Sequence, residues 1–114
     1  MNLLFVCSEN KLRSSTGEKV FSKYNEINTI GCGTNKDAQT VISGDLIEWS
    51  DIVFVMENNH REKVSKKFRD LLKNKKMVCL GIADNYEYMN PLLVRLIEER
   101  VINHIKIPLT LKNE

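Results

Sequence analysis

Residues 3–14 of this 114-residue chain read LLFVCSENKLRS, an apolar run that passes directly into a polar loop. Four consecutive apolar residues, 3–6, leave no polar face, which is typical of a strand buried on both sides. The amphipathic stretch 15–25 follows, and its apolar residues recur with helical spacing. Ser15 and Glu18 have the spacing of a capping box, which would start this helix. The first 25 residues therefore predict a strand, a loop and a helix.

The rest of the chain repeats this alternation of apolar and amphipathic stretches. Short apolar strands separated by helices predict a parallel sheet that is covered on both faces and joined by right-handed crossovers. We therefore predict a single domain over residues 1–114, with a three-layer α/β/α fold around a four-stranded parallel sheet. The predicted strands are 3–6, 27–31, 52–56 and 77–80, and the predicted helices are 15–25, 43–49, 59–73 and 91–104, the last with Pro91 as its first residue.

The loop after the first strand carries the strongest prediction of chemistry. In parallel sheets, ligands bind beyond the carboxyl ends of the strands, and Cys7 lies at such an end facing a helix N-terminus. The N–H dipoles of that terminus favour the thiolate, which is the nucleophilic form. The backbone N–H groups of residues 8–13 can converge on an oxyanion, and the Arg13 guanidinium can hold two phosphate oxygens. Ser14 can donate a hydrogen bond to the thiolate, and Asn10 tolerates a left-handed backbone.

This pattern predicts a cysteine nucleophile that acts on a phosphate ester. The competing interpretation makes Cys7 a small core residue and Arg13 a solvated surface charge. The predicted phosphate-binding residues of the loop are Ser8, Glu9, Asn10, Lys11, Leu12 and Ser14.

Composition restricts the other classes of function. Three cysteines without paired spacing predict neither a disulfide framework nor a zinc site, and they favour a reducing, cytoplasmic setting. No apolar run approaches the roughly 18 residues of a membrane helix. The formal charge of +2 is small, and we interpret the lysine-rich segment 63–76 as a solvated helix face rather than a nucleic-acid surface. We predict no metal and no cofactor.

Residues 4–14 resemble the signature of the low-molecular-weight protein tyrosine phosphatases. The resemblance continues at residues 31–34 and 50–56, and His60 follows a few residues later. More closely, the chain is similar to a short bacterial branch described only as predicted tyrosine phosphatases. The resemblance implies a metal-independent phosphomonoester hydrolase with a cysteinyl-phosphate intermediate. Its substrate would be a phosphorylated protein, with phosphotyrosine first, or a small phosphate ester, and its product inorganic phosphate.

The general acid of that family is an aspartate of an Asp-Pro loop near the C-terminus. Asp84 has the matching position, although Asn85 replaces the proline. Asn90, at the competing position, cannot deliver a proton at neutral pH. The resemblance therefore implies Asp84 as the acid, with Tyr86 and Tyr88 as walls of the pocket; the alternative is that Asp84 is a surface residue.

Two departures from the family keep other functions open. Leu12 replaces a second cysteine that can protect the nucleophile, and the loop 35–43 lacks the aromatic residue that the family places beside its substrate. One alternative is thiol-dependent arsenate reduction, which needs a relay of cysteines, whereas we expect Cys32 and Cys79 to pack in the core. The other is a catalytically silent module that binds phosphate or phosphoproteins. His60 is expected to cap or solvate the start of a helix.

Overall fold

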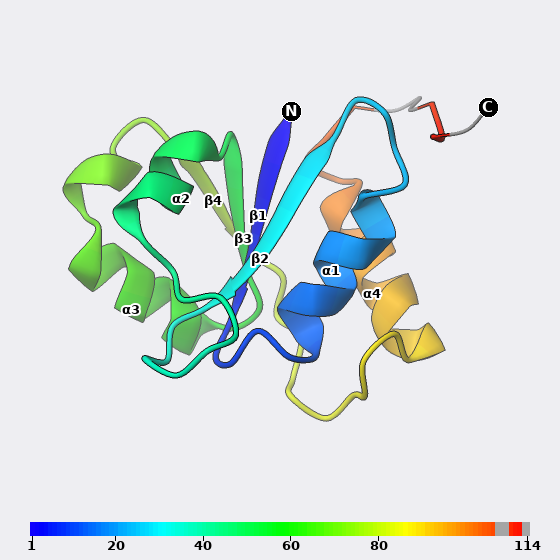
Figure 1. Ribbon diagram of the computed structural model, residues 1–114, viewed down its shortest axis with the longest axis horizontal. Coiled ribbons are helices and arrows are strands. Elements are labelled where there is room, and N and C mark those ends of the chain that lie inside the picture. The colour runs from blue at the N-terminus through cyan, green and yellow to red at the C-terminus, as the bar shows by residue number, and fades with distance from the viewer. Residues whose placement is uncertain (107–109, 113–114) are drawn as a thin grey trace.

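A computed structural model describes residues 1–106 and 110–112. Four parallel strands form one sheet in the order β2-β1-β3-β4, so β1 and β3 are central and β4 is an edge strand (Figure 1). The predicted four-stranded parallel sheet is confirmed. The elements are β1 (Asn2–Cys7), α1 (Arg13–Phe21), β2 (Asn28–Gly33), α2 (Gly44–Trp49), β3 (Ile52–Val55), α3 (Asn58–Lys67), the 3₁₀ helix η1 (Asp70–Leu72), β4 (Lys76–Cys79) and α4 (Pro91–Val101).

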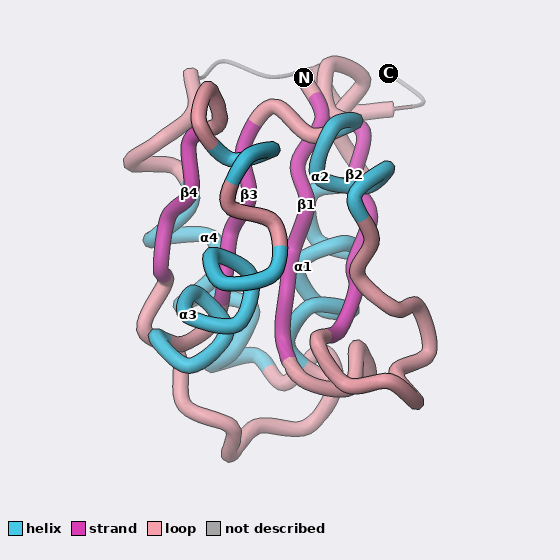
Figure 2. Tube along the Cα trace, turned by 90° about the vertical axis from the view of Figure 1, so that its left-hand side faces the viewer, coloured by secondary structure: helices cyan, strands magenta, loops and turns pink. Residues whose placement is uncertain are grey.

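The helices form two layers, with α1 and α4 on one face of the sheet and α2 and α3 on the other (Figures 1 and 2). Alternate residues of β1 point to opposite layers. Leu3, Phe5 and Cys7 belong to the core under α1 and α4, whereas Leu4 and Val6 belong to the core under α2 and α3. All five are buried, which is why this strand has no polar face. The three-layer prediction is therefore confirmed.

The start of α1 corrects a prediction. The helix begins at Arg13, so Ser15 lies inside its first turn and caps nothing. The Ser15 hydroxyl instead donates to the Asn10 carbonyl at 2.8 Å, and the Glu18 carboxylate accepts the backbone N–H of Gly31 in β2. The capping box predicted for Ser15 and Glu18 was wrong because Glu18 is drawn to the neighbouring strand.

Helix ends also differ from the prediction, whereas one helix start agrees with it. α3 ends at Lys67 rather than at residue 73, and η1 follows, so that Phe68, Leu71 and Leu72 all pack against the same core. Pro91 is the first residue of α4, as predicted. Within the described residues, no helix combines the length and apolar character needed to cross a bilayer.

β1, β3 and β4 have their carboxyl ends at the same end of the sheet, and the candidate site lies beyond these strand ends. The segment 34–39 is fastened to the loop after β1 by backbone hydrogen bonds from Thr34 to Cys7 and from Asn35 to Ser8, each 2.9 Å long. Gly33 makes this close approach possible, because a Cβ there would lie 2.4 Å from the Ser8 carbonyl oxygen. The loop is thus shaped by the strand beside it.

We expect Gly33→Ala to lower the free energy of unfolding by about 1–3 kcal/mol, since the clash is with backbone rather than with a flexible side chain. Gly44→Ala is the matched control, because its Cβ would meet only the end of the Leu71 side chain, at 3.1 Å, and alanine suits a helix better than glycine. Urea unfolding of both variants measures the difference. Equal midpoints for the two would contradict the role of Gly33.

Candidate active site

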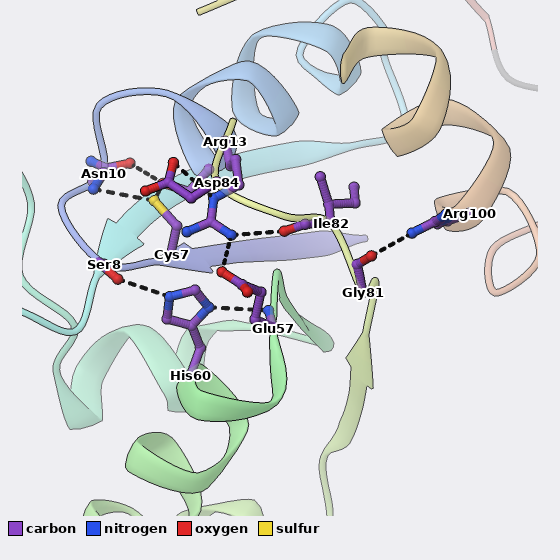
Figure 3. A network of polar contacts seen from close by, with 11 residues as sticks. Cys7, Ser8, Asn10, Arg13, Glu57, His60, Gly81, Ile82, Asp84 and Arg100 are labelled. Atoms are coloured by element: carbon purple, nitrogen blue, oxygen red, sulfur yellow. Dashed lines mark hydrogen bonds and ion pairs between the residues drawn. The ribbon is translucent and has the colours of Figure 1, made fainter. Parts of the chain in front are cut away.

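The sulfur of Cys7 lies at the end of β1 in a nest of hydrogen-bonding groups (Figure 3). Only 3% of the residue is exposed. The backbone N–H of Asn10 donates to Sγ at 3.3 Å, and the hydroxyl oxygen of Ser14 lies 2.9 Å from Sγ. Asn10 has a φ of +57°, which confirms the left-handed backbone predicted for it. The sulfur therefore has one backbone donor and one hydroxyl group within hydrogen-bonding distance.

The single hydroxyl hydrogen of Ser14 has two possible acceptors. Ser14 Oγ donates to Asn10 Oδ1 at 2.6 Å, so toward a neutral Cys7 it can only accept the S–H hydrogen. When Cys7 is a thiolate, the hydroxyl can turn to the sulfur instead. Asn10 Oδ1 then keeps the Ser15 hydroxyl at 3.2 Å, whose one hydrogen is shared with the backbone carbonyl of Asn10. The predicted hydrogen bond from Ser14 therefore belongs to the thiolate form.

Arg13 extends from the first turn of α1 into the space beside Cys7, and its side chain is only 3% exposed. Its Nη1 donates to the carbonyl oxygen of Ile82 at 2.7 Å and to the carboxylate of Glu57. Its Nε lies 3.6 Å from Asp84 Oδ1 (Figure 3). A buried guanidinium needs such partners because an unpaired charge is costly away from water. The three partners come from the segments that follow β3 and β4.

A pocket of about 220 Å³ opens above the sulfur and the guanidinium. Among the described residues, the backbone N–H groups of Ser8, Glu9, Lys11 and Leu12 donate to no other protein group. Free N–H groups around a concave loop beside a cation suit an oxyanion. No group of three or more His, Cys, Asp and Glu side chains in the described part of the chain is arranged to hold a metal. The lining residues are Cys7, Ser8, Glu9, Lys11, Leu12, Arg13, Asn35 and Asp84.

Comparison with known proteins identifies solved structures that share this fold. The sequence matches no family model and no curated protein. Solved structures do match, among them the low-molecular-weight protein tyrosine phosphatase SP-PTP from Streptococcus pyogenes, with a TM-score of 0.72 and 13% identity over 92% of this chain and 93% of that one. The chain has the fold of the low-molecular-weight protein tyrosine phosphatases.

Two further structures share this fold. Wzb from Vibrio vulnificus, in complex with benzylphosphonate, matches with a TM-score of 0.66 and 23% identity, over 87% of this chain and 92% of that one. The YwlE arginine phosphatase from Geobacillus stearothermophilus matches with a TM-score of 0.65 and 14% identity, over 94% and 99%. The fold is thus shared by proteins named for different phosphorylated residues.

The structure brings most of the predicted site residues together. Cys7, Arg13 and Asp84 line one pocket with Ser8, Glu9, Lys11 and Leu12, whereas Asn10 and Ser14 lie behind the sulfur and shape the loop. The competing interpretation is wrong for Arg13, which is buried beside Cys7 rather than solvated. Its other half agrees with the structure, because Cys7 is buried and packs with the core under α1 and α4.

The two tyrosines do not wall this pocket, contrary to our prediction. Tyr86 packs against the core under α1 and α4. Tyr88 is 49% exposed and lines a separate depression along the outer side of α1. The backbone N–H of Met89 donates to the Thr16 hydroxyl at 3.0 Å, which draws this part of the loop toward α1 and away from the sulfur.

Glu57 and His60 form a contact that the sequence analysis missed in part. Glu57 is the N-cap of α3, and its side chain accepts the backbone N–H of His60. His60 Nδ1 accepts the backbone N–H of Glu57 at 3.1 Å, so its Nε2 carries hydrogen and donates to Ser8 Oγ at 3.0 Å. The predicted cap is confirmed, but His60 is fully buried, not solvated. The spacing Glu-x-x-His directly after a buried strand was the available signal.

This clasp, defined as Glu57, His60 and Ser8, makes folding sensitive to acid. Burial and then the nearby Arg13 charge lower the pKa of His60 to about 4, against 6.5 in an unfolded chain. The unfolded state therefore binds more protons between these values, and the stabilisation is lost as pH falls from about 6.5 toward 4. Glu57 and Asp84 oppose this shift more weakly.

We expect the wild-type chain to lose about 3 kcal/mol of unfolding free energy through this histidine alone between pH 7 and pH 4. His60→Gln is the matched variant, because glutamine at this helix position can still cap the backbone but does not titrate. Urea unfolding of both chains across that range measures this loss as the difference between their free energies of unfolding. Parallel pH profiles for the two chains would show that His60 does not carry it.

Proposed function

We propose that this protein is a metal-independent phosphomonoester hydrolase that works through a cysteinyl-phosphate on Cys7. The observation that carries the proposal is the convergence of Cys7, the buried Arg13 and Asp84 on one pocket lined by unpaired backbone N–H groups. A nucleophile, an anion clamp and a proton donor are the groups that phosphoryl transfer through a covalent intermediate requires.

In the first step, the Cys7 thiolate attacks phosphorus in line with the leaving oxygen. The S–P bond forms as the P–O bond to the leaving group breaks. Arg13 and the loop N–H groups hold the three equatorial oxygens, where the charge of the transition state lies. Protonated Asp84 gives its hydrogen to the leaving oxygen, which departs as an alcohol or phenol.

In the second step, water attacks the cysteinyl-phosphate. The carboxylate of Asp84 takes a proton from the water as the new P–O bond forms and the S–P bond breaks. The sulfur leaves as a thiolate, to which the Ser14 hydroxyl, 2.9 Å away, turns its hydrogen. Inorganic phosphate is released, and the enzyme returns to its starting protonation state.

The substrate that we propose is a phosphorylated protein, with phosphotyrosine first, or a small phosphate ester. The pocket has room for the phosphate and the first atoms of the group that carries it, and its lining holds no aromatic residue. Selection by ring stacking is therefore not expected at the pocket itself. A thiolate nucleophile stays usable in a reducing compartment, so we place the protein in the cytoplasm.

The positions of the other cysteines speak against thiol-dependent arsenate reduction. Cys79 packs with the core under α2 and α3, on the opposite face of the sheet from Cys7. Cys32 is fully buried in that same core, and burial raises the pKa of its thiol far above the usual range. Neither sulfur is placed to form a disulfide with Cys7, which a cysteine relay requires.

The test compares two leaving groups. We expect Asp84→Asn to lower kcat/KM for phenyl phosphate by about 10²–10⁴-fold, and far less for p-nitrophenyl phosphate, whose leaving group needs little protonation. Cys7→Ser is the control; it should abolish turnover of both esters while inorganic phosphate still binds. Equal losses for the two esters would remove Asp84 as the acid. Phosphate binding without turnover in the wild-type chain would leave the silent binding module instead.

A further inference from the structure

Charge is distributed unevenly over this chain. Residues 57–76 contain eight Lys and Arg and three Asp and Glu, a net charge of +5. The other 94 residues contain nine basic and twelve acidic residues, a net charge of −3. The excess of positive charge therefore lies on the segment that forms α3, η1 and the start of β4. Figure 2 shows α3 and β4 on the same side of the molecule.

These positive charges border a depression of about 580 Å³ between α3, η1 and β4, which we call the basic trough. Among the described residues, no acidic side chain lies within ion-pair distance of Arg61, Lys66 or Arg69, and all three are exposed. Unpaired cations on a concave surface attract an anionic ligand. The lining of the basic trough contains one acidic residue, Glu62, and Lys73 is paired with Asp70 at 3.8 Å. The other lining residues are Arg61, Ser65, Lys66, Arg69, Leu72, Lys75 and Met77.

The basic trough leads to the catalytic pocket along the edge of the sheet. Met77 lines the basic trough, Cys79 and Gly81 line a second depression beside the first turn of α3, and Asp84 lines the catalytic pocket. At about 3.3 Å per residue of extended chain, the path from Met77 to Asp84 is at most roughly 23 Å long, because β4 ends at Cys79 and Gly81 has a φ of +66°. β4 is an edge strand of the described sheet, so its outer backbone groups face no further strand. Along the path, Arg61 donates to the Met77 carbonyl, and Arg100 donates to the carbonyls of Leu80 and Gly81.

We propose that the basic trough binds an acidic, extended segment of the phosphorylated protein while its phosphorylated residue occupies the catalytic pocket. This inference rests on the proposed function. An edge strand suits an extended peptide, whose carboxylates can meet Lys66 and Arg69 while its backbone runs beside β4. Arg61 Nη2, which donates to the Met77 carbonyl at 3.5 Å, would then turn to the peptide. A long nucleic acid is favoured less, because the negative charge of the remaining surface repels a polyanion that extends beyond the trough.

The experiment uses two phosphotyrosine peptides that differ only in a tract of four Glu or four Gln, placed about seven residues from the phosphotyrosine on either side. We expect the wild-type chain to hydrolyse the Glu peptide with a kcat/KM roughly tenfold higher at low salt, and the preference to fade at high salt. In Lys66→Glu/Arg69→Glu the preference should vanish. Arg95→Glu/Lys106→Glu changes the net charge equally at exposed positions elsewhere and should keep it.

Turnover of p-nitrophenyl phosphate separates docking from catalysis, because this ester cannot reach the basic trough. It should be equal in all three chains. Equal kcat/KM for the two peptides with the wild-type chain would overturn the proposal, and so would a reversal variant that loses the small ester as well. If Lys66→Glu/Arg69→Glu lost binding to a labelled single-stranded oligonucleotide but kept the preference for the Glu peptide, the basic trough would be assigned to nucleic acid. That result would also overturn the proposal.

Failure of the proposed function would be recognised separately. If the wild-type chain hydrolyses no aryl phosphate, fluorescence polarisation of the labelled Glu and Gln peptides still tests docking. If the wild-type chain bound the Glu peptide selectively and Lys66→Glu/Arg69→Glu did not, the proposal that the basic trough binds an acidic segment would stand. The hydrolase proposal alone would then be wrong. Equal binding of the two peptides would remove the docking site as well.

Discussion

The burial of the Arg13 guanidinium is the constraint on which the rest of this structure depends. A charge with 3% of its side chain exposed must be paired, and its partners come from the segments after β3 and β4. Arg13 thereby fixes the distances between three strand ends. The sulfur of Cys7 lies beside it because the loop between them is only five residues long. In the proposed function, an arriving phosphate would meet a guanidinium whose position Glu57, Ile82 and Asp84 already hold.

The clasp adds a second level of order to the same region. His60 donates to the Ser8 hydroxyl and Glu57 accepts from Arg13, so the first turn of α3 contacts both ends of the loop that follows β1. A loop fixed in this way keeps its N–H groups directed at one point, which is what preorganised anion binding requires. The neutral state of the buried histidine matters here, because a second cation beside Arg13 would be costly.

The sequence predicted the sheet, its two helical layers and the loop after β1, because four consecutive apolar residues followed by Cys7 and Arg13 allow few arrangements. The predictions were wrong where a side chain could contact either residues nearby in the sequence or residues of a distant element. Glu18 had the spacing of a capping residue but binds β2, and Tyr86 is drawn into the core. The contact between His60 and Ser8 joins residues 52 positions apart, and one sequence alone carries no signal for such a pair.

The central claim is that sulfur and guanidinium converge on one phosphoryl group, and the covalent intermediate tests it most directly. The wild-type chain should be mixed with p-nitrophenyl phosphate, quenched in acid within milliseconds, digested and examined by mass spectrometry. The account predicts a phosphoryl group on the peptide that contains Cys7, and none when the quench follows exhaustion of the substrate. Sustained turnover with Cys7 unmodified at every time point, or a phosphoryl group on a different residue, would contradict it.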